Sequence, residues 1–261
     1  MTLIQSILLG IIQGVTEFLP ISSSGHLVLF QKIFRVAEPS LTFGIVVHLG
    51  TLAAVFAVYW KDIVMLLKKP FQKLTYLLIA ATIPTAIIGV VFKDFFEKIF
   101  VSGSTLGIDF FITGSVLFFA DSMRHGYKSV EETSYLDAAF IGLLQGAAIL
   151  PAVSRSGLTI SGALFRNMDR DFAAKFSFLL SIPAILGAAV FDMKDVLKAG
   201  IGNLDMLSLG AGFIFSVIFG YISIKFMIKI LKKGKMRYFS YYVFTLGALI
   251  LIDQFITHIF F

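Results

Sequence analysis

The chain has 261 residues, of which 57% are hydrophobic, 15% are charged and 29 are phenylalanines. Soluble domains carry roughly 25% charged residues, so this composition argues against a soluble globular protein and excludes a disordered chain. Cysteine is absent, which removes disulfides, thiol catalysis and thiolate metal sites. The net charge of +6 is typical of the basic loops of a membrane protein, and we expect no nucleic-acid partner.

Apolar segments of two kinds follow one another along the chain. Two of them, 1–31 and 138–165, are interrupted by Pro, Ser and Gly at 20–25 and 151–157. Lipid cannot satisfy the backbone groups that such breaks expose, so we predict two re-entrant helix–loop–helix hairpins. A membrane span needs about 20 mostly apolar residues. The six further segments of this kind lie at 41–60, 74–92, 105–120, 172–191, 206–224 and 238–261.

The two interrupted segments are similar in sequence, which predicts an internal repeat. The pattern G-x-x-Q-G at 10–14 returns at 142–146, and Pro followed by a Ser-rich turn at 20–25 returns at 151–157. We therefore predict a single membrane domain over 1–261, with one repeat at about 1–130 and the other at about 131–261. Each repeat contains one hairpin and three transmembrane helices. Because three is odd, the second repeat is expected to have inverted topology in an all-α integral membrane protein.

The distribution of basic residues predicts the orientation. Most of the 22 Lys and Arg residues lie in 61–73, 121–135, 154–175 and 225–238, which the six spans place on one side. Cytoplasmic loops carry this excess, so we expect a multi-pass protein of the plasma membrane with both termini outside. The first hairpin then enters from the outside and the second from the cytoplasm, and their tips are expected to meet near the midplane.

Each hairpin carries one isolated charge. Glu17 is the only acidic residue among the first 31, and Arg155 is the only charge between Asp137 and Arg166. A charge within apolar sequence is costly and marks a functional site by default. The alternative is a structural ion pair that holds the hairpins together. His48 also lies in an uncharged span, where we expect a packed, hydrogen-bonded residue.

The Ser-rich turns that precede the second helix of each hairpin indicate an anion site. Consecutive backbone N–H groups at a helix N-terminus bind anions, and Arg recognises phosphate through two hydrogen bonds. Hydroxyl groups add donors, and one of them becomes a nucleophile where a base such as His26 activates it. The predicted phosphate-binding residues are Ser22, Ser24, Gly25, Ser154, Arg155, Ser156, Gly157 and Thr159. The alternative is that a serine of the turn only caps its helix and that His26 is a hydrogen-bonded structural residue.

Gln13 and Glu17 share a helix face, since they are four residues apart. A buried carboxylate beside an amide can hold a divalent cation or accept a proton. A polar contact between helices is the alternative for Gln13.

These residues resemble two signatures of the undecaprenyl-diphosphatase family, also called bacitracin-resistance proteins. Residues 13–26 read Q-G-V-T-E-F-L-P-I-S-S-S-G-H, similar to an acidic residue or Gln, three residues, Glu, and then P-x-S-S-x-G-H. Residues 151–159 resemble the second signature, P-G-x-S-R-S-x-x-T. Two positions depart from the family: Gln13 stands where many members have Glu, and Ala152 stands where Gly is usual. Alanine is disfavoured there if the backbone needs a positive φ.

The resemblance implies a membrane phosphatase that removes the terminal phosphate of a polyprenyl diphosphate and so recycles the lipid carrier of cell-wall or surface-glycan synthesis. It implies catalytic roles for Glu17, Ser23, His26 and Arg155, with either Ser23 or His26 as the nucleophile and Ser23 preferred. It also implies a divalent cation, Mg²⁺ or Ca²⁺, at Glu17 and Gln13. The expected partners are the lipid substrate and membrane lipids, a homodimer being left open, and the site is expected to open to the outer face.

A transporter or lipid flippase is the main alternative. Inverted repeats with broken helices are typical of transporters, and Glu17 and Arg155 would then recognise a head group without cleaving it. Catalysis separates the two hypotheses, since a flippase releases no phosphate.

Overall fold

The computed structural model describes residues 1–36, 41–123, 126–199 and 205–260, and these residues form helices without a β-strand. Five short or hairpin helices are α1 (Leu3–Phe18), α2 (Ser23–Ile33), α5 (Lys93–Ser102), α7 (Tyr135–Ala147) and α8 (Arg155–Phe165). The others are α3 (Leu41–Lys68), α4 (Lys73–Val91), α6 (Leu106–Asp121), α9 (Arg170–Ala199), α10 (Met206–Lys232) and α11 (Arg237–Ile252), which continues into a π-helical turn, η1 (Asp253–Thr257).

Both predicted hairpins form. α1 and α2 pack together on either side of the turn at 19–22, and α7 and α8 do so on either side of the turn at 148–154. Helices α1 and α7 both begin with a capping box, built by Thr2 with Gln5 and by Ser134 with Asp137. The all-α membrane architecture expected from the composition is therefore confirmed.

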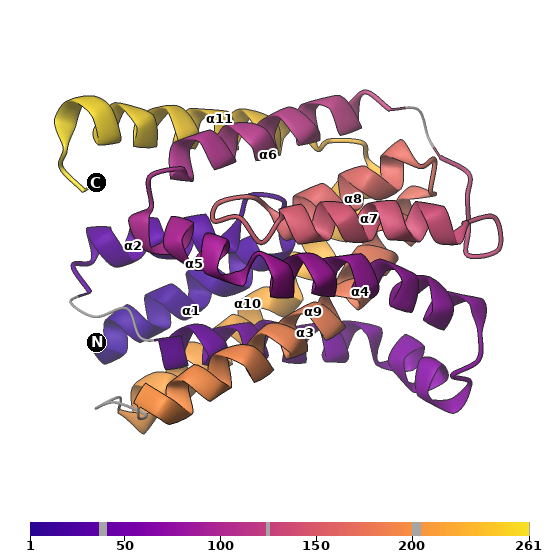
Figure 1. The fold of residues 1–261 in the computed structure, drawn as a ribbon, viewed down its shortest axis with the longest axis horizontal. Coiled ribbons are helices and arrows are strands. Elements are labelled where there is room, and N and C mark those ends of the chain that lie inside the picture. The colour runs from indigo at the N-terminus through magenta and orange to yellow at the C-terminus, as the bar shows by residue number, and fades with distance from the viewer. Residues whose placement is uncertain (37–40, 124–125, 200–204, 261) are drawn as a thin grey trace.

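Five described helices are long and apolar enough to cross a membrane: α3, α4, α9 over Arg170–Met193, α10, and α11 together with η1. The predicted span at 105–120 forms α6, which has 16 residues and so rises about 24 Å, less than the usual span. It packs along α11 (Figure 1). The short helix α5, between α4 and α6, is not among the predicted elements.

The repeated G-x-x-Q-G pattern has a packing explanation. In the first hairpin, a Cβ on Gly10 would lie 2.6 Å from the Gly212 carbonyl oxygen, so α1 and α10 touch backbone to backbone. In the second, a Cβ on Gly142 would lie 2.0 Å from the Ala81 carbonyl oxygen, so α7 and α4 do the same. Small residues are what allow such close approach of helices in membranes. The first helix of each hairpin thus packs on a long helix of the other predicted repeat. The two repeats and their inverted topology stay predictions.

The two chain ends lie at the same end of the molecule, and the α3–α4 connection and the start of α11 lie toward the other end (Figure 1). The placement of 61–73 and 225–238 away from the chain ends agrees with the arrangement that the six spans predict, while the orientation in the membrane stays a prediction. The tips of the two hairpins meet between these ends, where the Ser24 hydroxyl accepts a hydrogen bond from Ala152 N at 3.3 Å and the Ser156 hydroxyl donates to the Leu19 carbonyl at 3.1 Å.

Candidate active site at the tips of the two hairpins

The turn of the first hairpin places Ser23 at the first position of α2. Ser22 is the N-cap, and its hydroxyl accepts a hydrogen bond from Gly25 N at 3.3 Å. The backbone of Ser22 has φ 68°, in the left-handed region that costs a non-glycine residue about 1–2 kcal/mol. A strained residue at such a turn persists only where its surroundings hold it. Ser23 therefore follows a turn that the rest of the site must keep in place.

The second hairpin repeats this design. Ser154 caps α8 by accepting a hydrogen bond from Gly157 N at 3.1 Å, and Arg155 is the first residue of the helix. Ala152 has φ 61°, so the position where the family usually has glycine does adopt the left-handed conformation. Thr113 of α6 holds this turn, since its hydroxyl donates to the Ala152 carbonyl at 3.2 Å and accepts from Ser154 N at 3.0 Å.

Glu17 is the centre of the cluster. Its Oε2 accepts hydrogen bonds from Ser23 Oγ at 2.5 Å and from Gln13 Nε2 at 2.9 Å, and its Oε1 pairs with Arg155 Nη2. Glu17 is buried, and the Arg155 side chain is 18% exposed. The carboxylate thus joins a serine hydroxyl of one hairpin to the guanidinium of the other.

The Glu17–Arg155 ion pair is the contact expected from the structural alternative, and it is formed. A purely structural pair, however, gives no role to the Ser23 hydroxyl on the same carboxylate. The geometry would allow the hydroxyl to act as a nucleophile, the carboxylate as its base and the guanidinium as a phosphate-binding group within one hydrogen-bonded cluster.

The imidazole of His26 is hydrogen-bonded to groups other than Ser23. Its Nδ1 lies 2.7 Å from the Ser22 carbonyl oxygen, and its Nε2 lies 2.7 Å from the hydroxyl of Tyr242 on α11. Both ring nitrogens are therefore engaged, and the group that contacts Ser23 Oγ is Glu17. The structure brings Glu17, Ser23 and Arg155 together, and it connects His26 to them through the backbone of Ser22.

The other predicted phosphate-binding residues fall into two groups. Ser22, Ser24 and Gly25 lie at the start of α2, with the Ser22 and Ser24 hydroxyls 3.2 Å apart. The others lie in the second hairpin. Ser154 Oγ lies 3.3 Å from Ser156 Oγ, and a Cβ on Gly157 would lie 3.0 Å from Ser154 Cβ, so this turn is tightly packed. Thr159 Oγ1 lies 2.6 Å from Ser177 Oγ and so joins the hairpin to α9. Both helices nevertheless begin at the junction of the hairpins, beside Glu17 and Arg155.

Sequence reasoning missed the position of His48. Its Nε2 lies 3.9 Å from Glu17 Oε2, its Nδ1 bonds to the Gly44 carbonyl at 2.7 Å, and its side chain is 35% exposed. It is hydrogen-bonded as expected, but it borders the cluster instead of being packed away from it. A histidine in an uncharged span was the only available signal. Tyr242 and Thr113 gave none, because their roles depend on contacts between distant segments.

The side-chain oxygens of Glu17 and Gln13 are suitable ligands for a hard divalent cation that arrives with a phosphorylated ligand. Gln13 Oε1 is buried and has no hydrogen-bond partner, which leaves one amide oxygen available beside the carboxylate. Within the described residues, no group of three His, Cys, Asp or Glu side chains is arranged to hold a metal. Such a cation would therefore take most of its ligands from the phosphates and from water, as Mg²⁺ commonly does.

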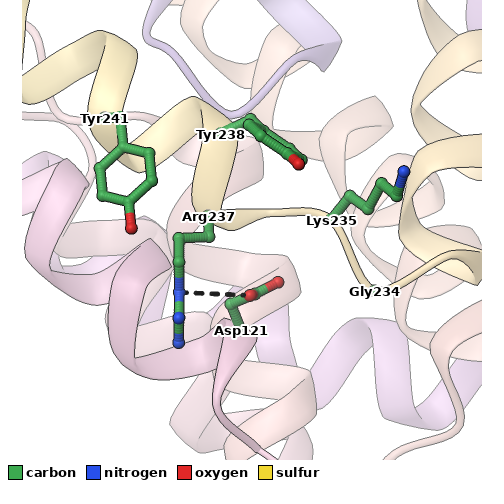
Figure 2. Close-up of a pocket in the computed structure, with 6 residues that line it drawn as sticks. All are labelled: Asp121, Gly234, Lys235, Arg237, Tyr238 and Tyr241. Atoms are coloured by element: carbon green, nitrogen blue, oxygen red, sulfur yellow. Dashed lines mark ion pairs between the residues drawn. The ribbon is translucent and has the colours of Figure 1, made fainter.

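A separate cavity of about 300 Å³ lies at the start of α11. Figure 2 shows its lining, in which Arg237 faces Asp121 at the end of α6, with Lys235, Tyr238 and Tyr241 around them. The Arg237–Asp121 ion pair spans 3.6 Å, and Met236 N donates to the same carboxylate at 2.8 Å. These contacts fasten α11 to α6, and the cavity contains no residue of the hairpin tips.

Known proteins resemble the chain over nearly its full length. The family model described as "Bacitracin resistance protein BacA" matches residues 6–249. A protein of Carboxydothermus hydrogenoformans named "Undecaprenyl-diphosphatase" is 55% identical over 252 residues, covering 96% of this chain and 97% of the relative. One of Bacillus cereus named "Undecaprenyl-diphosphatase 3" is 48% identical over 255 residues, covering 98% of each. One of Halothermothrix orenii named "Undecaprenyl-diphosphatase" is 43% identical over 254 residues, covering 97% of this chain and 98% of the relative.

The family model spans both hairpins, and the relatives match a longer part of the chain. The resemblance seen in two short signatures thus extends to the whole helical framework that positions them. The chain belongs to the bacitracin-resistance protein BacA family.

Proposed function

We propose that this protein is a membrane phosphatase that hydrolyses undecaprenyl diphosphate to undecaprenyl phosphate and inorganic phosphate. The observation that carries the proposal is the hydrogen bond of Ser23 to Glu17, beside Arg155, in a chain whose relatives are named for this activity. The product is the lipid carrier used again in cell-wall or surface-glycan synthesis.

In the first step, Ser23 Oγ attacks the terminal phosphorus while Glu17 accepts the hydroxyl proton. The bond between this phosphorus and the bridging oxygen breaks, and undecaprenyl phosphate leaves with the proton that Glu17 returns to it. General-base catalysis of this kind contributes about 10²- to 10⁴-fold. The short contact between Ser23 and Glu17 is the geometry that this transfer requires.

In the second step, water attacks the phosphoserine. Glu17 takes a proton from the water, the P–O bond to Ser23 Oγ breaks, and the proton returns to the serine, which releases inorganic phosphate. Arg155 stabilises the charge on the transferred group in both steps, so its pair with Glu17 must loosen as the diphosphate binds. The N–H groups at the starts of α2 and α8 supply further donors.

The engagement of His26 supports Ser23 over His26 as the nucleophile. Attack by Nε2 would require His26 to leave the Tyr242 hydroxyl, and attack by Nδ1 would require it to leave the Ser22 carbonyl. Ser23 needs neither rearrangement, because its hydroxyl already lies against the base.

A bound divalent cation, Mg²⁺ or Ca²⁺, would neutralise charge on the diphosphate, held by Gln13 Oε1 and Glu17 on the protein side. The unpartnered Gln13 oxygen supports this assignment.

The proposed orientation places both termini and the opening of the site on the outer face, with the polyprenyl tail remaining in the bilayer. It rests on the excess of Lys and Arg at the opposite end of the molecule. Homodimer formation stays a prediction. The flippase alternative gives no role to the Glu17–Ser23 hydrogen bond, and the relatives' names do not support it.

Phosphate release from undecaprenyl diphosphate by the purified protein in lipid nanodiscs tests the proposal. We expect Ser23→Ala to lose at least 100-fold in rate, because it removes the nucleophile. Ser115→Ala is the matched control, since this serine lies on α6 and, among the described residues, its hydroxyl bonds to the backbone of its own helix. An active Ser23→Ala variant would overturn the assignment of Ser23, and an inactive, folded wild type would overturn the activity.

A further inference from the structure

The contact between His26 and Tyr242 joins the two ends of the sequence at the site. His26 Nε2 lies 2.7 Å from the Tyr242 hydroxyl, and the two rings stack with centroids 5.7 Å apart and planes 12° apart. The ring of Phe110, on α6, meets the imidazole edge-on at 5.6 Å. Side chains of α6 and α11 therefore fix the orientation of the His26 ring.

The partners of His26 also fix the direction of its hydrogen bonds. The Ser22 carbonyl can only accept, so Nδ1 carries the ring proton and donates to it. In the neutral imidazole, Nε2 then has only a lone pair, and it accepts a hydrogen bond from the Tyr242 hydroxyl. Hydrogen bonds thus run in one direction, from Tyr242 through His26 to the Ser22 carbonyl.

The end of this chain of hydrogen bonds is the strained residue of the turn. Ser22 has φ 68°, and its carbonyl also accepts a hydrogen bond from the backbone N–H of His26 at 3.3 Å. The next residue is Ser23, whose hydroxyl meets Glu17. Any rotation of the Ser22 backbone would therefore move Ser23 relative to its base.

Helix α11 is well placed to hold this turn. Its first residue, Arg237, is paired with Asp121 at the end of α6 (Figure 2), and Tyr242 lies about one and a half turns further along. The tyrosine is thus carried by the anchored end of the helix.

We propose that Tyr242 is a positioning residue for the chemical step, which acts through His26 to hold the Ser22 turn and so keeps Ser23 against Glu17. The proposal rests on the phosphatase function proposed above. It assigns the tyrosine to the rate of the reaction and not to the binding of the lipid, because the Tyr242 hydroxyl bonds to His26 and the hydrogen bonds of Glu17 and Arg155 in the described residues go to other groups.

Tyr242→Phe tests this by keeping the stacked ring and removing the hydroxyl. We expect kcat for phosphate release to fall about 3- to 10-fold, the effect of losing one buried hydrogen bond, and KM to stay within about twofold. Tyr241→Phe is the matched control, since its exposed side chain lies on the same helix next to Tyr242 and its phenol has no hydrogen-bond partner among the described residues. This control is expected to match the wild type in both constants.

Two further readouts separate positioning from a general loss of structure. Nitrogen-15 NMR of labelled histidines should show His26 with the proton on Nδ1 in the wild type. The His26 Nε2 signal should shift in Tyr242→Phe. The variant His26→Gln identifies the His26 signals among those of the four histidines. In the double variant His26→Gln/Tyr242→Phe, kcat for phosphate release should be less than about twofold below that of His26→Gln alone, because Tyr242 acts through His26.

A wild-type kcat in Tyr242→Phe, an increased kcat, or effects that multiply independently in the double variant would overturn the proposal. A wild type that releases no phosphate would instead overturn the proposed function, while the NMR signal would still report whether the hydrogen bond exists. If Tyr242→Phe does not fold, the proposal is judged on the His26 signal of Asp121→Asn, which loosens the anchor of α11 and should shift the same Nε2 resonance.

Discussion

Removal of Arg155 should separate the structural contribution of its ion pair from the catalytic one. In Arg155→Ala the Glu17 carboxylate stays buried with Ser23 and Gln13 as hydrogen-bond donors and loses the guanidinium with which it pairs. Breaking a buried ion pair by removing one partner costs about 3–5 kcal/mol, since it leaves an uncompensated charge. We therefore expect Arg155→Ala to lower the free energy of unfolding by that amount.

The double variant Glu17→Gln/Arg155→Ala removes both charges. Because the amide still bonds to its neighbours, we expect stability to return to within about 1–2 kcal/mol of the wild type. Phosphate release should stay at least 100-fold below the wild type, since both the base and the phosphate-binding cation are gone.

Denaturant titration in detergent micelles gives the stabilities, and phosphate release from undecaprenyl diphosphate gives the rates. Arg155→Lys serves as the control that keeps the charge while losing the two-point recognition of phosphate. A double variant that regains activity together with stability would refute the reasoning, because the pair would then be only structural. Equal stabilities of the single and double variants would refute the buried-charge argument.

Three further predictions concern the turns, the helix packing and the cation. Ala152→Gly should change the free energy of unfolding by less than about 1 kcal/mol, because relief of the φ 61° strain offsets the lost methyl group. Ala152→Val should destabilise the protein by more than about 2 kcal/mol. Thermal unfolding measures both variants, and equal effects would contradict the strained turn. Gly142→Ala should destabilise the protein by about 1–3 kcal/mol, because its methyl group meets the Ala81 carbonyl. Gly187 faces open space on α9, so Gly187→Ala is the control and should not destabilise the protein. Chemical denaturation compares the two variants, and an unchanged stability of Gly142→Ala would contradict the close helix contact. Gln13→Glu should tighten Mg²⁺ binding at least several-fold, because it adds a carboxylate. The Mg²⁺ dependence of the melting temperature, in the presence of a non-hydrolysable diphosphate lipid, measures this binding. An unchanged dependence would remove Gln13 from the cation site.

The elements that sequence reasoning found are those with a strong physical cost. Glu17 and Arg155 stand out because charges in apolar sequence are expensive, and the structure brings them into contact. The Pro and Ser breaks indicate the hairpins for the same reason, since lipid cannot satisfy exposed backbone groups. Ala152 does have a positive φ, the condition under which alanine is expected to be disfavoured, because a preference for glycine reflects the backbone conformation.

The parts that were missed depend on contacts between distant segments. His48 and Tyr242 are ordinary residues of apolar helices, and only the packing of α3 and α11 places them beside Glu17 and His26. The proximity of His26 to Ser23 in sequence indicated a base and its nucleophile, yet the α2 helix turns the imidazole toward α11. The short α6 was expected as a full span because composition reports apolar character and not where a helix ends.

The proposal that Ser23 is the nucleophile predicts which residue takes up the phosphate, and this residue can be identified directly. Undecaprenyl diphosphate labelled with ³²P in its terminal phosphate is mixed with the protein, and portions are quenched in acid and in base within milliseconds. We predict acid-stable label on a peptide that contains Ser23, and no such label in Ser23→Ala. The amount of label should increase under conditions that slow hydrolysis of the phosphoserine intermediate. Base-stable, acid-labile label on His26, or label that persists in Ser23→Ala, would contradict the assignment of Ser23 as the nucleophile activated by Glu17.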